Sequence, residues 1–133
     1  WEAECGDCHL AYPPDLLPAR SWSRMLDEAA DHFGEDLALA PEAEATIRAW
    51  LVSRAAERDA TEHAWRIHRS VPDDEAPQRI TELDWWEQAH VAVPDDAFDH
   101  PDVGVRGRCH ACHPDAATGA FQAATLLTPE KSP

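Results

Sequence analysis

The chain has 133 residues, 44% of them hydrophobic, and its 26 acidic and 11 basic side chains give a formal net charge of −15. Such an acidic surface argues against nucleic acid and anionic lipid as partners, because both are bound by basic patches. The length fits one domain or two very small lobes, and no apolar run approaches the roughly 18 residues that a membrane span requires.

The N-terminal part begins with Cys5-Gly6-Asp7-Cys8-His9, after which prolines keep the segment 11–18 extended. A helix is then predicted, with Ser21 as its cap and Gly34 as the residue that ends it. His32 falls on the flank of the apolar face of this helix, which is formed at helical spacing by Trp22, Met25, Leu26, Ala29 and Phe33.

Pro41 opens a second predicted helix at the position that proline favours, with an apolar face formed by Ala43, Ile47, Trp50, Leu51 and Ala55. The periodic pattern then breaks down, and an acidic loop predicts a boundary between two lobes, 1–58 and 59–133. A third helix is predicted after Thr81 and before Pro94, with an apolar face formed by Leu83, Trp86 and His90. The rest of the chain predicts loops and no strand.

Two short motifs, Cys5-Gly6-Asp7-Cys8-His9 and Cys109-His110-Ala111-Cys112-His113, both read C-x-x-C-H and together use all four cysteines. Two cysteines three positions apart lie about one helical turn from each other, so both thiols can add to the vinyl groups of one porphyrin. The histidine that follows can ligate the iron. We therefore predict two covalent haem c groups, held by thioethers to Cys5, Cys8, Cys109 and Cys112, with His9 and His113 as proximal ligands.

The same cysteines allow two other interpretations. The two C-x-x-C pairs could together hold one zinc ion, or each pair could form a disulfide. Structural zinc pairs usually lie some tens of residues apart, whereas these are separated by almost the whole chain. Zinc also gives no reason for a histidine after each pair, and the redox C-x-x-C motif belongs near a βαβ pattern that this sequence lacks.

The sixth ligand of each iron decides what a haem can do, since methionine raises the potential, a second histidine lowers it, and an open position admits small molecules. Met25 is the single methionine, and its place within an apolar stripe is more typical of a core residue. Two bis-histidine haems are therefore the simplest prediction. His32 and His90 are the favoured distal ligands, because each lies beside or on an apolar helical face near a tryptophan.

The remaining histidines are weaker candidates. His63 and His68 lie in the irregular stretch 59–79, which could fold over a haem, so they stay in reserve. His100 is expected to be a solvated loop residue, and the side chain of His110 is expected to point away from the iron of its own motif.

Several longer segments can be compared with known families: the first motif with Ala11-Tyr12-Pro13-Pro14, Leu17-Pro18-Ala19-Arg20-Ser21-Trp22, His32-Phe33-Gly34-Glu35-Asp36, Arg79-Ile80-Thr81, Trp86 to His90, and the second motif with Ala116 and Gly119-Ala120-Phe121. Together they resemble the small periplasmic dihaem cytochrome c family of purple and related bacteria. The resemblance implies a mostly α fold, with an N-terminal lobe like a class I cytochrome c and a less regular C-terminal lobe, each packed around a covalent haem. By position it points to His9 and His113 as proximal ligands and to His32 and His90 as distal ones. Sequence order then pairs His32 with the first haem and His90 with the second.

The resemblance also implies a function, namely low-potential electron transfer by a protein that is not an enzyme. Its expected partners are a membrane b-type cytochrome and a small oxygen-binding monohaem cytochrome c, and we expect a monomer. Covalent haem attachment in bacteria occurs outside the cytoplasm, so we expect a periplasmic protein whose targeting segment has been removed. The alternative is a small haem enzyme or a gas-binding protein in which one distal position is open or labile.

Overall fold

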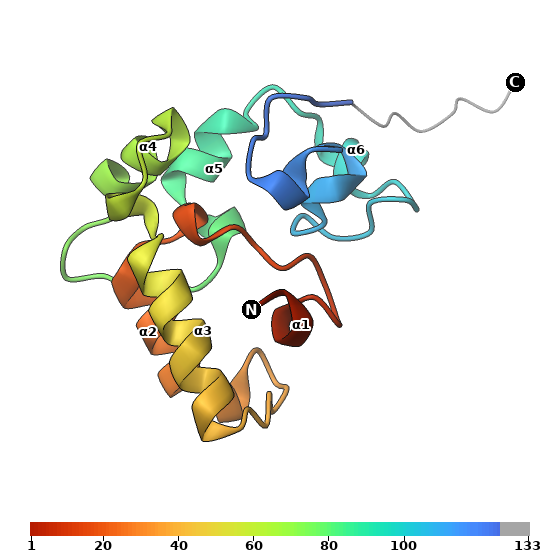
Figure 1. Ribbon diagram of the computed structural model, residues 1–133. Coiled ribbons are helices and arrows are strands. Elements are labelled where there is room, and N and C mark those ends of the chain that lie inside the picture. The colour runs from red at the N-terminus through yellow and green to blue at the C-terminus, as the bar shows by residue number, and fades with distance from the viewer. Residues whose placement is uncertain (126–133) are drawn as a thin grey trace, which may run out of the picture.

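The computed structural model describes residues 1–125, which form short helices joined by long loops and contain no β-strand (Figure 1). The α-helices are α1 (Glu2–Cys5), α2 (Ala19–Asp27), α3 (Pro41–Ser53), α4 (Glu62–Ser70), α5 (Asp84–Ala89) and α6 (Asp95–Phe98). The 3-10 helices are η1 (Pro14–Leu16), η2 (Ala29–Asp31), η3 (Ala56–Arg58), η4 (Ile80–Glu82), η5 (Cys109–Ala111) and η6 (Ala116–Thr118). The expectation of a mostly helical fold is confirmed. Within these residues, every helix is too short or too polar to cross a membrane.

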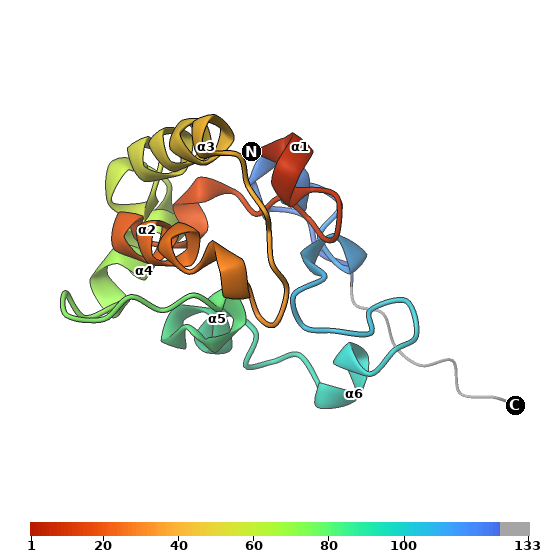
Figure 2. The same ribbon diagram turned by 90° about the horizontal axis from the view of Figure 1, so that it is seen from below.

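Helices α2 and α3 lie side by side and form one end of the molecule (Figures 1 and 2). The predicted helix from Pro41 is confirmed, since α3 begins at that proline and ends at Ser53. Ile47 and Leu51 on its apolar face are buried. Trp50 on the same predicted face is exposed instead, with the guanidinium of Arg54 3.5 Å from the centre of its ring. This cation–π contact covers one face of a tryptophan ring that is not packed in the core.

The helix predicted from Ser21 to Gly34 is much shorter than expected. Helix α2 begins at Ala19 after Pro18 and already ends at Asp27, so His32 is not on its flank. Leu37 N–H donates to the Ala29 carbonyl over 2.9 Å, which closes residues 29–37 into a loop and satisfies backbone groups that more helix would have used. Gly34 is not a helix cap but belongs to a tight turn within this loop, where its φ is +93°.

The stretch predicted as irregular, 59–79, contains helix α4. The Thr61 side chain caps it by accepting a hydrogen bond from Ala64 N–H. Only Ala64 and Ile67 of α4 are buried, so the apolar stripe is too narrow to give a clear periodic signal. The prediction that His63 and His68 lie in an irregular linker is therefore wrong, because both belong to this helix.

The helix predicted between Thr81 and Pro94 is divided. It consists of the 3-10 helix η4 and of α5, with Leu83 between them. Helix α5 begins at Asp84 and ends at Ala89, and His90 is its C-cap. Another short helix, α6, follows Pro94 in a segment that was expected to be loop.

The buried core is continuous across the predicted lobe boundary. One cluster of buried side chains contains Leu17 and Leu51 from the first predicted lobe together with Ile67 and Leu83 from the second. Helix α4 packs against η1 and η3 as well as against α5. The division into 1–58 and 59–133 stays a prediction, and its last residues, 126–133, lie outside the described part of the chain.

Candidate haem-binding sites

The two C-x-x-C-H motifs adopt turns that bring their cysteines close together. In the first, Cys5 is the last residue of α1, and its N–H donates to the Trp1 carbonyl over 2.9 Å. In the second, η5 carries Cys109, and the N–H groups of Cys112 and His113 both donate to the Cys109 carbonyl, over 3.2 and 2.8 Å. Each motif thus presents two thiols and one imidazole from a single turn of backbone, as one porphyrin requires.

The structure supports neither of the two other interpretations of the cysteines, a shared zinc ion or a disulfide within each pair. All four cysteines are free thiols, so neither C-x-x-C pair forms a disulfide. Within residues 1–125, no group of three or more histidine, cysteine, aspartate or glutamate side chains is placed to hold a metal ion, so the four-cysteine zinc site is not assembled. Burial raises the pKa of the Cys5 and Cys109 thiols, because it disfavours the charged thiolate.

The first motif places its histidine opposite His32. The rings of His9 and His32 have their centres 6.2 Å apart and an interplanar angle of 29°. Two imidazoles on opposite sides of one metal ion have ring centres about 6 Å apart, because each metal–nitrogen bond is about 2.0–2.1 Å long and each ring centre lies about 1 Å beyond its coordinating nitrogen. The spacing of this pair therefore fits one iron between the two rings.

The second motif places its histidine opposite His90. The rings of His113 and His90 have their centres 6.1 Å apart, and their planes are nearly perpendicular at 89°. Both residues line a cavity of about 220 Å³ whose other walls are mainly apolar, including Trp86 and Phe121. Arg106 also lines it and can pair with the carboxylates of a haem. The residues present at both motifs fit the covalent haem that the motifs predict.

Backbone carbonyl groups orient three of these four imidazoles. Nδ1 lies 2.7 Å from the Leu10 carbonyl oxygen in His9, 2.8 Å from that of Trp86 in His90, and 2.9 Å from that of Ala123 in His113. A carbonyl oxygen only accepts, so Nδ1 carries the proton and Nε2 keeps its lone pair. Ligand histidines in metalloproteins are oriented in this way. In His32, by contrast, Nδ1 is buried and has no hydrogen-bond partner among residues 1–125.

Burial also favours the neutral form of both distal candidates. It lowers the pKa of His32, where the neighbouring His9 adds to the effect. It likewise lowers the pKa of His90, against the opposing effect of the hydrogen bond to the Trp86 carbonyl. A neutral imidazole has the free lone pair that a metal ligand needs.

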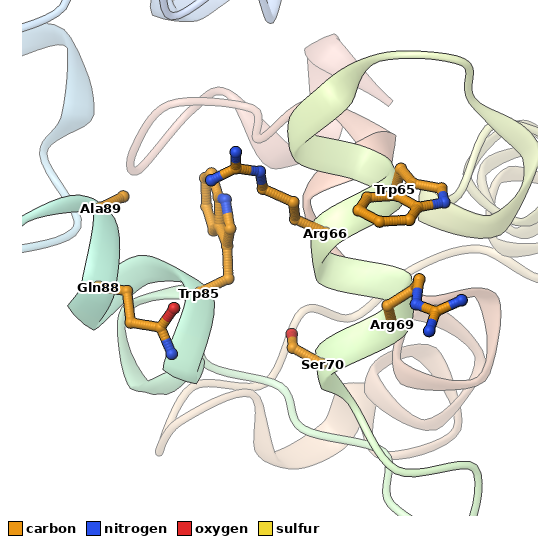
Figure 3. Close-up of a pocket in the computed structure, with 7 residues that line it drawn as sticks. All are labelled: Trp65, Arg66, Arg69, Ser70, Trp85, Gln88 and Ala89. Carbon is orange, nitrogen blue, oxygen red and sulfur yellow. The ribbon is translucent and has the colours of Figure 1, made fainter.

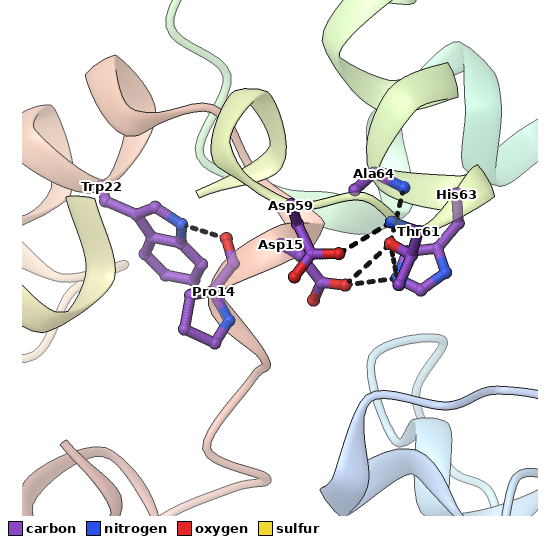
Figure 4. A network of polar contacts seen from close by, with 7 residues as sticks. All are labelled: Pro14, Asp15, Trp22, Asp59, Thr61, His63 and Ala64. Carbon is purple, nitrogen blue, oxygen red and sulfur yellow. Dashed lines mark hydrogen bonds and ion pairs between the residues drawn. The ribbon is translucent and has the colours of Figure 1, made fainter. Parts of the chain in front are cut away.

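His63 has a different partner, which sequence reasoning missed. Its Nε2 lies 2.6 Å from Oδ2 of Asp15, and the Thr61 hydroxyl donates to the same oxygen over 3.3 Å (Figure 4). The Asp15 and His63 side chains are only 10% and 17% exposed. This buried pair joins α4 to η1, and no sequence signal links two residues 48 positions apart.

The remaining histidines and Met25 were weaker candidates for ligands, and their surroundings differ. His68 and His110 are exposed. His100 is not the solvated residue that was expected, since its side chain is only 18% exposed and its Nδ1 accepts a hydrogen bond from Asp102 N–H. Met25 is half-buried and packs against the core cluster, as expected for a core residue.

A second cavity, of about 520 Å³, opens between α4 and α5 (Figure 3). Trp85 lines this cavity and also the one beside His90, so its ring forms a wall between the two. The lining residues are Trp65, Arg66, Arg69, Ser70, Trp85, Gln88 and Ala89. None of them is a cysteine or a histidine, so this cavity has no group that could hold haem iron.

Tyr12 connects the regions of the two motifs. Its ring centre lies 5.0 Å from that of His9, and its hydroxyl donates a 2.7 Å hydrogen bond to the Gly107 carbonyl. The same carbonyl lies 3.5 Å from the sulfur of Cys109. Burial raises the pKa of Tyr12 to about 12, so the phenol stays a donor. The two residues are 95 positions apart, which is why the sequence gives no sign of this contact.

Replacing Tyr12 by Phe is expected to lower the free energy of unfolding of the holoprotein by about 1–2 kcal/mol, because the Gly107 carbonyl loses its donor. Replacing Gly107 by Ala should have a similar effect, since a Cβ there would lie 2.8 Å from the Tyr12 oxygen and displace it. Both changes remove one hydrogen bond, so the double variant should be clearly less destabilised than the sum of the two. Guanidinium unfolding of the four proteins measures this, and strict additivity would contradict the link.

Comparison with known proteins places this arrangement in a family. The family model described as dihaem cytochrome c matches residues 1–121. The chain belongs to the dihaem cytochrome c family. Such proteins carry two covalent haem c groups and transfer electrons, and they are not enzymes. The predictions of cofactor and class are thereby confirmed.

Solved structures support the same assignment over most of the chain. A dihaem cytochrome c from Rhodobacter sphaeroides is 34% identical, with a TM-score of 0.79 over 89% of this chain and 91% of that one. The dihaem cytochrome c of Shewanella baltica OS155 is 32% identical, with a TM-score of 0.76 over 95% of this chain and 89% of that one. No curated protein matches the chain.

Proposed function

We propose that this dihaem cytochrome c is a low-potential electron carrier in which each iron is ligated by two histidines. His9 and His32 would ligate the N-terminal haem, and His113 and His90 the C-terminal haem. The observation that carries the proposal is the spacing of the two ring pairs, 6.2 and 6.1 Å between centres. Both values fit two trans metal–nitrogen bonds of about 2.0–2.1 Å together with about 1 Å from each nitrogen to its ring centre.

The ligand set decides what such haems do. Each haem supplies a one-electron iron couple, whose potential is lower with two histidines than with histidine and methionine. With protein ligands on both faces, neither iron has a position for a substrate. Nδ1–H groups fixed on carbonyl oxygens hold His9, His90 and His113 in one orientation, so little rearrangement is needed when the charge of the iron changes.

A visible spectrum of the reduced protein, recorded with and without carbon monoxide, tests the proposal. Two six-coordinate haems should give a low-spin spectrum that brief exposure to carbon monoxide leaves nearly unchanged. A haem quantitation on the same sample should give two haems per chain. A large immediate change with carbon monoxide would show an open position and favour a gas-binding protein or haem enzyme.

The partners and location follow from the resemblance and from charge. We propose a periplasmic carrier between a membrane b-type cytochrome and a small oxygen-binding monohaem cytochrome c. The net charge of −15 supports a docking partner with a basic face.

Electron transfer to a basic redox protein should therefore slow steeply as salt rises, because screening shortens the Debye length to about 10 Å at 0.1 M and less above it. Stopped-flow rates between low and physiological ionic strength measure this, with a neutral redox partner as control. If the rates with both partners are equally insensitive to salt, electrostatic steering by the acidic surface is contradicted.

A further inference from the structure

The four histidines proposed as ligands are not held equally well. His9, His90 and His113 each bond a backbone carbonyl through Nδ1, at 2.7–2.9 Å. His113 bonds the carbonyl of Ala123. The position of Ala123 is fixed in turn by Asp115, whose carboxylate accepts the Ala123 N–H over 3.1 Å. The Nδ1 atom of His32 is buried, and no hydrogen-bond partner for it lies within the described part of the chain. An imidazole without this bond is both a less firmly oriented and a weaker donor to the metal.

His90 is further fixed by its place at the end of a helix. As C-cap of α5, it donates its backbone N–H to the Trp86 carbonyl over 3.1 Å, and its Nδ1 bonds the same carbonyl. Its ring also stacks on the Trp86 ring, with centres 4.1 Å apart and an interplanar angle of 21°. Trp86 is itself only 5% exposed, so the distal side of the C-terminal haem rests on the core.

His32 depends instead on a surface turn. Its N–H donates to the Glu35 carbonyl over 2.7 Å, and Glu35 N–H donates back over 3.1 Å. Between them Phe33 has a φ of +52° and Gly34 a φ of +93°. A bulky non-glycine residue at positive φ is strained. The ring centre of Phe33 lies 4.8 Å from that of His32. Phe33 is 48% exposed and meets the guanidinium of Arg79 at 4.2 Å from its ring centre, so a surface contact rather than the core holds this turn.

We propose that His32 is the weaker distal ligand, so that a small anionic ligand such as cyanide replaces it at the N-terminal ferric haem while His90 stays bound at the C-terminal haem. This rests on the proposed bis-histidine ligation. In the exchange His32 gives up its bond from Nε2 to iron and keeps that lone pair, and the incoming ligand supplies a lone pair in its place. The oxidation state of iron does not change. The turn 32–35 moves outward with the ring.

Cyanide titration of the ferric holoprotein, followed by low-temperature EPR, tests this order. The low-spin signal of the N-terminal haem should be replaced at a cyanide concentration roughly 10–100-fold lower than that of the C-terminal haem, the usual effect of losing an outer-shell bond. Each signal is assigned from the variant His32→Met or His90→Met, whichever alters it. Replacement of the C-terminal signal first, or of both signals together, would overturn the proposal.

A matched pair of glycine variants tests whether the turn controls the bond. Gly34 and Gly104 have φ values of +93° and +73°, and a Cβ at either would meet nothing within 4 Å. Alanine therefore strains both loops without a clash, but only Gly34 adjoins a proposed ligand. Gly34→Ala should lower the cyanide midpoint of the N-terminal haem by roughly tenfold, and Gly104→Ala should change neither midpoint. Equal effects of the two variants would refute the role of the turn. A high-spin signal in the parent protein, before any cyanide is added, would instead contradict the proposed bis-histidine ligation itself.

Discussion

Replacing His32 or His90 by Ala is expected to open one haem, and only one, of the two in the holoprotein. Each ring faces the histidine of a single motif, at 6.2 Å from His9 and 6.1 Å from His113, so the loss of one ring leaves the other pair intact. The ferric spectrum should show one haem in a high-spin or water-bound form. After reduction, that haem should bind carbon monoxide at once, in an amount equal to half of the total haem.

Methionine at the same positions separates ligation from packing. His32→Met or His90→Met should keep the haem low-spin where the thioether reaches iron, and should raise its potential, because a thioether favours reduced iron relative to imidazole. His63→Ala and His68→Ala serve as controls and should leave both haem spectra nearly unchanged, since Nε2 of His63 is bound to Asp15 and His68 is exposed. Opening of a haem in a control variant, with none in His32→Ala, would show that α4 supplies the ligand.

Replacing Asp15 by Ala is expected to lower the free energy of unfolding by about 2–3 kcal/mol, the largest stability effect that a single polar contact offers here. The change removes the acceptor of both His63 and Thr61 from a site where the Asp15 side chain is only 10% exposed. Tryptophan fluorescence during guanidinium unfolding measures it, because the haems quench the six tryptophans in the folded protein.

Asp102→Ala is the matched control for Asp15→Ala. Asp102 also lies beside a histidine, His100, but the contact is 3.8 Å long and the Asp102 side chain is 79% exposed. Surface pairs of this kind contribute about 0–1 kcal/mol, so the control should be nearly as stable as the parent protein. An equal decrease of the free energy of unfolding in the two variants would contradict the claim that the Asp15–His63 contact is strongly stabilising because it is buried.

The position of this pair also predicts where the destabilised protein loosens. The His63 ring lies 6.0 Å from Phe121, and Phe121 lies 5.6 Å from His113. Asp15→Ala should therefore disturb the EPR signal of the C-terminal haem more than that of the N-terminal haem.

Local features of the sequence were enough to predict the cofactors. The chemistry of a C-x-x-C-H motif lies within five consecutive residues, so no tertiary information is needed to expect a haem there. The helix from Pro41 could be predicted equally well, because its start signal and its buried residues Ile47 and Leu51 lie on the same short segment.

Helical periodicity was a poor guide to the surroundings of the two proposed distal histidines. The stripe from Trp22 to Phe33 suggested one long helix, but α2 ends at Asp27 and Phe33 lies in a turn at positive φ. His32 was therefore selected for its place on a helix that does not extend that far, and the structure brings it beside His9 through the turn instead. Trp86 and His90 met the expectation more directly, since α5 and its C-cap stack the two rings.

Contacts between distant segments could not be predicted at all. The bonds from Tyr12 to Gly107 and from Asp15 to His63 join residues 95 and 48 positions apart. Neither depends on a motif or a period, because each contact forms only when segments distant in the sequence pack together.

Low-temperature EPR of the untreated ferric holoprotein tests the central claim, two bis-histidine haems, most directly. Two low-spin signals of equal intensity are expected, and they should differ in shape. The rings of His9 and His32 are nearly parallel, at 29°, so as ligands of one iron they would donate to the same d orbital and should give a rhombic signal. The rings of His90 and His113 are crossed, at 89°, so as ligands they would leave two d orbitals nearly equal in energy and should give a strongly anisotropic signal. A high-spin signal that accounts for either haem would contradict the account.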